Sequence, residues 1–124
     1  MLLRYILNNI TPGNVQLHLF TNNVTPSIGD TLSVYTESVA AGYSAFALSG
    51  SAWTFATSAG TSTATYARQT FTFSTSETLY GYYLTNVDVG NVQALVHVER
   101  FAGAPFQVPT GGGTIDVDPQ IGLH

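Results

Sequence analysis

His97 and Glu99 are the first pair of residues whose types could support acid–base chemistry. In an extended strand alternate side chains point to the same face, so these two would lie side by side as a proton donor and acceptor. The same alternation places Val96 and Val98 on the opposite face, which is the natural core side of such a strand. We therefore expect His97 and Glu99 to face solvent or an interface and to have no catalytic role.

A Ser–His–Asp triad is defined by geometry and not by order along the chain, so sequence alone leaves one open. The segment closest to a nucleophile elbow is residues 42–46, GYSAF, which lacks the closing glycine and has no strand–turn–helix pattern around it. The chain is rich in serine, which makes chance Ser–His pairs unavoidable. We expect that the protein is not an enzyme.

Asp116 and Asp118 could contribute to a calcium site, which needs roughly six to eight oxygen ligands. The surrounding sequence departs at once from the calcium-loop pattern, and Ile115 and Val117 fit the buried side of a strand, which leaves both aspartates on its wet side. The chain has no cysteine, so it offers no disulfide and no thiolate ligand. The glycines at 111–113 are not a phosphate loop, because no lysine follows them. We expect no metal and no other cofactor.

Five aromatic residues could form a platform for a sugar ring: Trp53, Tyr66, Tyr80, Tyr82 and Tyr83. Aromatic side chains also fill the cores of β-proteins, and tyrosine is favoured at protein interfaces where its hydroxyl stays wet. We favour a core or interface role for these residues over carbohydrate binding.

The elements that must position these residues are short strands separated by turns. Apolar and polar residues alternate with a period of two along much of the chain after Gly13, and Asn, Gly and Pro mark the turns. The pattern predicts strands or extended segments over 15–20, 31–39, 43–49, 78–87, 94–101 and 114–117, and a hairpin that pairs 52–57 with 63–73. It indicates an all-β fold, either an antiparallel β-sandwich or a jelly-roll-like domain.

The two ends of the chain depart from this pattern, although residues 1–124 together have the length of a single domain. Residues 1–12 are expected to form a short helix or an arm that docks onto a neighbour, because the Thr-Pro-Gly sequence at 11–13 stops any helix. This segment carries four apolar residues at helical spacing: Leu2, Leu3, Ile6 and Leu7. Residues 111–124 follow the glycine run and are expected to be flexible.

Charged residues make up 8% of the chain, against about 25% in an ordinary globular domain. There is no lysine, and the formal net charge is −4, so the chain lacks the cations that neutralise phosphates and we expect no nucleic-acid partner. Its apolar runs fall far short of the roughly 20 residues that span a bilayer, so we expect no membrane partner. A surface this poor in charge gives a lone chain little protection against association and indicates an assembly.

Several short segments occur in a fixed order that spans most of the chain: LHLFTNNVTP at 17–26, YTE at 35–37, GYSAFAL at 42–48, Trp53, ETLYGYYLT at 77–85 and VERF at 98–101. In this order and spacing they resemble a family of small proteins encoded among the structural genes of tailed bacteriophages. The resemblance implies a virion component without catalytic residues, either a head decoration (cement) protein or a small tail-associated protein.

Together these observations predict a capsid decoration protein on the capsid exterior of the virion, with the major capsid protein as its partner and a homotrimer as its assembly. The alternative is a carbohydrate- or receptor-binding module on a phage tail or fibre. The residues expected at interfaces are Leu2, Leu3, Ile6, Leu7, Trp53, Tyr82 and Tyr83.

Overall fold

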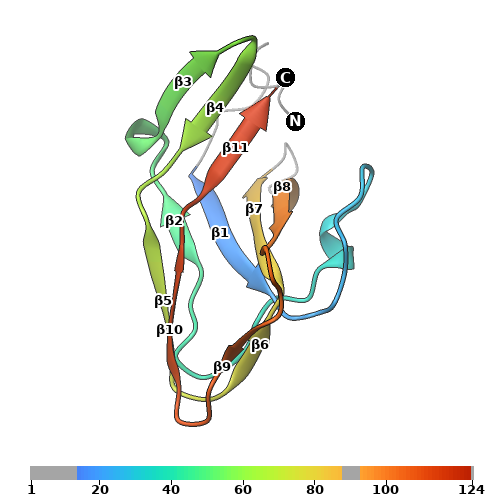
Figure 1. Cartoon of the computed structure of the whole chain (residues 1–124), viewed down its shortest axis with the longest axis vertical. Coiled ribbons are helices and arrows are strands. Elements are labelled where there is room, and N and C mark those ends of the chain that lie inside the picture. The colour runs from blue at the N-terminus through green and yellow to red at the C-terminus, as the bar shows by residue number, and fades with distance from the viewer. Residues whose placement is uncertain (1–13, 88–92, 124) are drawn as a thin grey trace.

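The computed structural model describes residues 14–87 and 93–123, which form strands and two short 3₁₀ helices and contain no α-helix. Figure 1 shows the strands as several small sheets. In chain order the elements are β1 (Val15–Phe20), η1 (Leu32–Val34), β2 (Phe46–Leu48), η2 (Gly50–Ala52), β3 (Thr54–Ser58), β4 (Thr61–Thr65), β5 (Gln69–Phe73), β6 (Glu77–Leu79), β7 (Gly81–Val87), β8 (Gln93–Arg100), β9 (Phe106–Val108), β10 (Gly113–Val117) and β11 (Gln120–Leu123).

The largest sheet, here called the main sheet, has the strand order β2-β1-β7-β8 and is antiparallel throughout. Leu17 lies opposite Leu84 and Leu19 opposite Tyr82, and all four are buried. Paired residues point to the same side of a sheet, so this side of the main sheet is apolar. It forms the principal core with Phe71 and other apolar residues of β5 and β10.

The remaining sheets are small. β5 pairs with β10, β6 pairs with β9, and β11, β4 and β3 form a three-stranded sheet in that order. The chain runs from β4 directly into β5 and from β10 directly into β11, so the three-stranded sheet continues the β5–β10 ribbon away from the core (Figure 1). β3 is an outer strand of this sheet.

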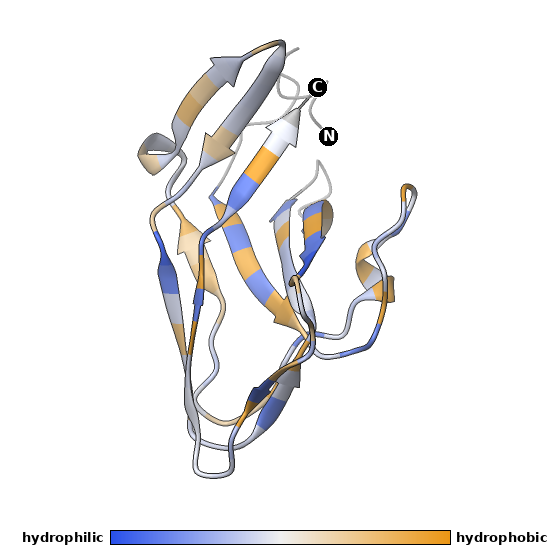
Figure 2. Cartoon of the chain, viewed as in Figure 1, coloured by the Kyte–Doolittle hydropathy of each residue, from blue (hydrophilic) through white to orange (hydrophobic). Residues whose placement is uncertain are grey.

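The second side of the main sheet is also covered. Phe20, Tyr35 and Tyr83 form a separate buried cluster there, against which Leu32 and Val98 pack. The covering segment is the long connection between β1 and β2, which contains η1. Because both sides of the main sheet are covered, the inner strand β7 buries successive residues, from Tyr82 to Leu84. In β1, hydrophobic and hydrophilic residues alternate along most of the strand (Figure 2).

The all-β prediction is confirmed for the described residues, which form several small antiparallel sheets and no closed barrel. The finer prediction of a sandwich or jelly roll stays a prediction. The β3–β4 hairpin is confirmed, with a tighter turn at Ala59 and Gly60.

Three predicted strands differ from the structure. The segment 31–39 is a 3₁₀ helix followed by one isolated bridge between Phe20 and Glu37, because it crosses over the main sheet and does not join it. The predicted strands 63–73 and 78–87 each divide in two, because their halves pair with different partners.

The C-terminal segment also differs from the prediction of flexibility. β10 pairs with β5 along its length and β11 pairs with β4. Gly111 and Gly112 have φ of 97° and 94° and form the turn into β10, where a methyl group on Gly112 would overlap the Phe73 carbonyl oxygen. The glycine run is therefore a close-packed turn that needs glycine. The predicted arm, residues 1–12, lies outside the described residues.

Candidate functional site

His97 and Glu99 lie on β8 on the side of the principal core, which is not the side predicted. Glu99 is exposed to solvent, as expected, whereas His97 is half-buried. The register between β7 and β8 shifts after Leu84: His97 lies opposite Leu84, whereas Leu95 lies opposite Thr85. The register passes over Val96, whose side chain is therefore turned outward and is 42% exposed. The expectation that Val96 faces the core is wrong, because a bulge breaks the alternation on which it depends.

Tyr82 connects Glu99 to the C-terminal strand. Its hydroxyl donates to Glu99 Oε2 at 2.8 Å and accepts from the Gln120 backbone N–H at 3.2 Å. Burial raises the pKa of the Tyr82 phenol above its ordinary value, and the bond to Glu99 raises it further. His97 Nε2 lies 3.7 Å from the same carboxylate oxygen, Glu99 Oε2. The hydrogen bonds of the Tyr82 hydroxyl therefore connect β7 to β8 and to β11.

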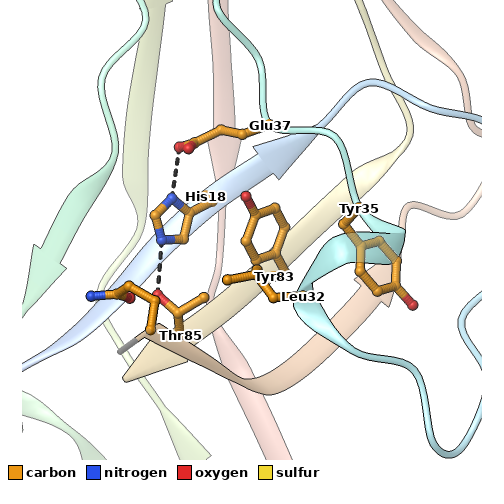
Figure 3. A pocket seen from close by; sticks show the side chains of 7 residues that line it. His18, Leu32, Tyr35, Glu37, Tyr83 and Thr85 are labelled. Carbon is orange, nitrogen blue, oxygen red and sulfur yellow. Dashed lines mark hydrogen bonds and ion pairs between the residues drawn. The ribbon is translucent and has the colours of Figure 1, made fainter. Parts of the chain in front are cut away.

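A second polar network lies on the opposite side of the main sheet, at residues that the sequence analysis did not single out. His18 Nδ1 is 2.6 Å from Glu37 Oε2, and His18 Nε2 is 2.9 Å from Thr85 Oγ1 (Figure 3). The imidazole also stacks on the ring of Tyr83, with centroids 4.7 Å apart and planes at 14°. The histidine is thus held on both nitrogens and on one face.

Tyr43 extends this network to the backbone of β1. β2 pairs with β1 only as far as Leu17, so Leu19 has no strand partner on that side. The Leu19 N–H instead donates to the Tyr43 hydroxyl at 3.1 Å, and that hydroxyl donates to Glu37 Oε2 at 2.8 Å. Burial raises the pKa of the Tyr43 phenol, which keeps it protonated as a donor. The network therefore anchors the 35–43 segment to the edge of the main sheet.

A depression of about 180 Å³ opens beside this network (Figure 3). Its wall combines the polar groups with the rings of the second apolar cluster: His18, Leu32, Tyr35, Glu37, Tyr83, Thr85 and Gln93. Tyr35 and Tyr83 are 6% and 3% exposed, so their rings leave almost no surface open to a ligand. The depression is too closed on its aromatic side for a ring to stack there.

The order Thr85–His18–Glu37 has the connectivity of a catalytic triad: hydroxyl, imidazole, carboxylate. A nucleophile must be reached by its substrate, and Thr85 is only 1% exposed in the middle of β7. The geometry thus gives this hydroxyl a structural role, as a donor or acceptor that fixes the imidazole. The expectation that the protein is not an enzyme stays a prediction.

The two aspartates considered for calcium both form ion pairs with Arg68. Arg68 donates from Nε and Nη2 to the two carboxylate oxygens of Asp118, at 2.9 and 3.1 Å, and lies 3.8 Å from Asp116. The bond from Arg68 lowers the pKa of Asp118. Thr70 donates to Asp116 at 2.7 Å. No group of three or more potential metal ligands occurs among the residues that the structure describes.

The five aromatic residues considered for a sugar platform do not form one surface. Tyr82 and Tyr83 lie on opposite sides of β7, and both are buried. Trp53 is half-buried and packs edge-to-face on Tyr66, with centroids 5.2 Å apart. The guanidinium of Arg100 lies over the ring of Tyr80, 5.2 Å from the centroid of that ring.

The predicted interface residues have different outcomes. Tyr82 and Tyr83 are a correction: the chain buries their rings itself, because β7 is covered on both sides, so they have almost no area left for a partner. Trp53 keeps part of its surface, and its interface role stays a prediction. The other four, Leu2, Leu3, Ile6 and Leu7, lie outside the described residues.

Exposed apolar side chains occur instead at positions that the sequence analysis did not select. Ile28 and Val39 are almost wholly exposed, and Phe55 on β3 is 75% exposed. Ile28 stands at the tip of an ordered turn, in which Asp30 accepts bonds from the Ser27 N–H at 2.9 Å and the Tyr35 hydroxyl at 2.7 Å. The bond from Tyr35 lowers the pKa of Asp30.

The chain matches no protein-family model, no curated protein and no solved structure. Within residues 14–87 and 93–123, no helix is long and apolar enough to cross a membrane.

Proposed function

We propose that this protein is a structural component of a tailed-bacteriophage virion, a decoration protein that binds the exterior of the capsid and stabilises the assembled lattice. The observation that carries the proposal is the exposure of Ile28 and Val39 on a chain with only 8% charged residues. Burial of these side chains against a partner would remove their apolar surface from water, which favours association. The phage assignment itself comes from the sequence resemblance.

A decoration protein needs rigid contact points, and the loop at Ile28 has this property. Its turn is closed by the Asp30 carboxylate, which is in turn held by Tyr35, a buried member of the second apolar cluster. Preorganised contacts lose less conformational entropy on binding than mobile ones. A protein that binds the assembled lattice and not the free capsid subunits would stabilise the assembled state by mass action.

The carbohydrate-binding alternative has less support. A sugar site of the expected kind needs accessible aromatic faces, and the tyrosines beside the depression are buried. Glycan binding without capsid binding would nevertheless favour this alternative.

We keep the homotrimer as the expected arrangement on the capsid, since capsid lattices present three-fold positions that a repeated contact can match. The test of the function is co-sedimentation with empty shells of the major capsid protein encoded nearest to this gene. We expect saturable binding that Val39→Ser or Ile28→Ser weakens at least tenfold, whereas the conservative exposed control Ala102→Ser leaves it unchanged. Failure of the parent protein to sediment with these shells would refute the proposal.

A further inference from the structure

β3 is an unprotected outer strand. Among residues 14–87 and 93–123, Thr54–Ser58 pairs with β4 alone, and every one of its residues is exposed. Outer strands usually carry a lysine, a proline or a bulge that prevents another chain from pairing with them. β3 has none of these: its sequence is TFATS, and its register with β4 is continuous. The sequence has no charged residue between Glu37 and Arg68, so neither β3 nor its hairpin partner β4 carries a charge.

The register shows which backbone groups of β3 are free to pair. The Tyr66 N–H donates to the Pro119 carbonyl at 3.0 Å, which places the hydrogen-bonding groups of residue 66 toward the β11 side. These groups alternate along a strand, so those of residues 61, 63 and 65 face β3. Their partners in β3 are Ser58, Ala56 and Thr54. The N–H and C=O groups of Phe55 and Thr57 therefore point outward.

We propose that β3 pairs with β3 of a second copy of the chain, antiparallel, about a two-fold axis at Ala56. In this register Phe55 of each copy lies opposite Thr57 of the other. Both residues present outward N–H and C=O groups, so each pair exchanges both of its hydrogen bonds. The two three-stranded sheets then become one continuous sheet with β3 at its centre.

The side chains suit this register. The two Ala56 residues face each other at the axis in a position without direct hydrogen bonds, where the strands approach most closely and a small side chain fits. Phe55, 75% exposed in the single chain, gains a neighbour in Thr57 of the second copy and lies diagonal to the other Phe55. A charge at position 56 would lie opposite its own copy at the two-fold axis, and β3 carries no charge there or at its other positions.

This contact is independent of the proposed capsid binding. A two-fold contact gives dimers of the free protein, and on a lattice it would join copies that belong to neighbouring trimers. The hairpin turn, with positive φ at Ala59 and Gly60, keeps β3 extended and fixed in place.

Disulfide trapping tests the register directly, because the chain has no cysteine of its own. Facing positions without direct hydrogen bonds are about 4.5 Å apart between Cα atoms, within the range that a disulfide spans. We expect Ala56→Cys to form a disulfide-linked dimer under mild oxidation, far above the level of the exposed control Ala102→Cys. Thr54→Cys alone should stay at the control level, whereas a mixture of Thr54→Cys with Ser58→Cys should form the linked heterodimer.

Sedimentation of the cysteine-free protein gives the second test. We expect the parent protein to be a dimer at micromolar concentration. Ala56→Lys should raise the dissociation constant of this dimer at least tenfold, because it places two like charges opposite each other. Thr65→Lys, which adds the same charge to the inner strand β4, should leave the dimer intact. The proposal is overturned if the parent is monomeric or only trimeric and Ala56→Cys crosslinks no more than Ala102→Cys. It is equally overturned if Ala56→Lys leaves the dimer unchanged.

Discussion

Removal of one hydroxyl, by Tyr43→Phe, tests how the structure fastens the 35–43 segment to the main sheet. The Tyr43 hydroxyl accepts the Leu19 N–H at 3.1 Å and donates to Glu37 at 2.8 Å. Leu19 is fully buried, and β2 has ended before it, so no strand replaces the lost acceptor. The phenyl ring itself can stay stacked on Phe71, which isolates the effect of the hydroxyl.

The expected cost follows from the buried donor. A buried N–H left without a partner costs about 1–3 kcal/mol, whereas a replaceable hydrogen bond at the surface costs much less. For a chain of this length, a loss of about 2 kcal/mol in the free energy of unfolding lowers the Tm by roughly 5–10 °C. The assay is urea denaturation followed by circular dichroism, together with a thermal melt.

Tyr66→Phe is the matched control. The Tyr66 hydroxyl also accepts a backbone N–H at 3.1 Å, from Ser49, but this bond is exposed and water can replace it. We expect the free energy of unfolding to change by less than about 0.5 kcal/mol. Equal effects of the two substitutions would refute the reasoning, because burial would then not decide the cost. A Tyr43→Phe variant as stable as the parent would do the same.

Two further predictions concern stability. Gly112→Ala should lower the free energy of unfolding by roughly 2–4 kcal/mol, because its φ is 94° and the added methyl group overlaps the Phe73 carbonyl. Gly111 has a similar φ but open space around it, so Gly111→Ala should cost only about 1 kcal/mol, from the backbone alone. Equal costs of the two substitutions in chemical denaturation would contradict this prediction. Stability should also fall as the pH rises above about 10, where unfolded tyrosine ionises, by up to about 1.4 kcal/mol per pH unit for each tyrosine whose phenol the fold keeps neutral. Burial raises the pKa of four tyrosines, that of Tyr35 to about 12: Tyr35, Tyr43, Tyr82 and Tyr83. Denaturation at a series of alkaline pH values, with phenolate absorbance as a second signal, would contradict this if stability stayed level to about pH 11.

Strands whose pattern is local could be predicted well from the sequence. β1 lies over the predicted residues 15–20, since Leu17 and Leu19 alternate with polar residues and one side of the strand is the principal core. The β3–β4 hairpin is predicted by the pattern of its two flanking strands, 52–57 and 63–73. The scarcity of charge, which underlies both proposals, is also a property of the sequence alone.

The burial of β7 could not be predicted in the same way. Tyr82 and Tyr83 are successive residues, and an alternating strand would leave one of them exposed. Both are buried because the β1–β2 connection folds over the second side of the main sheet. Their expected availability to a partner failed for that reason, and the outward turn of Val96 depends on a bulge that only the pairing of β7 with β8 defines.

The polar network at His18 belongs wholly to the tertiary structure. Glu37 lies 19 residues from His18 along the chain, and Thr85 lies 67 residues from it. The three residues share no sequence motif. The sequence by itself determined the class of structure, because hydrophobic alternation and turn residues act over a few neighbours. Which polar groups meet, which aromatic rings are covered and which strand edge is left open were decided by the packing of distant segments, since hydrogen bonds and van der Waals contacts act only between atoms that the fold brings within a few ångströms.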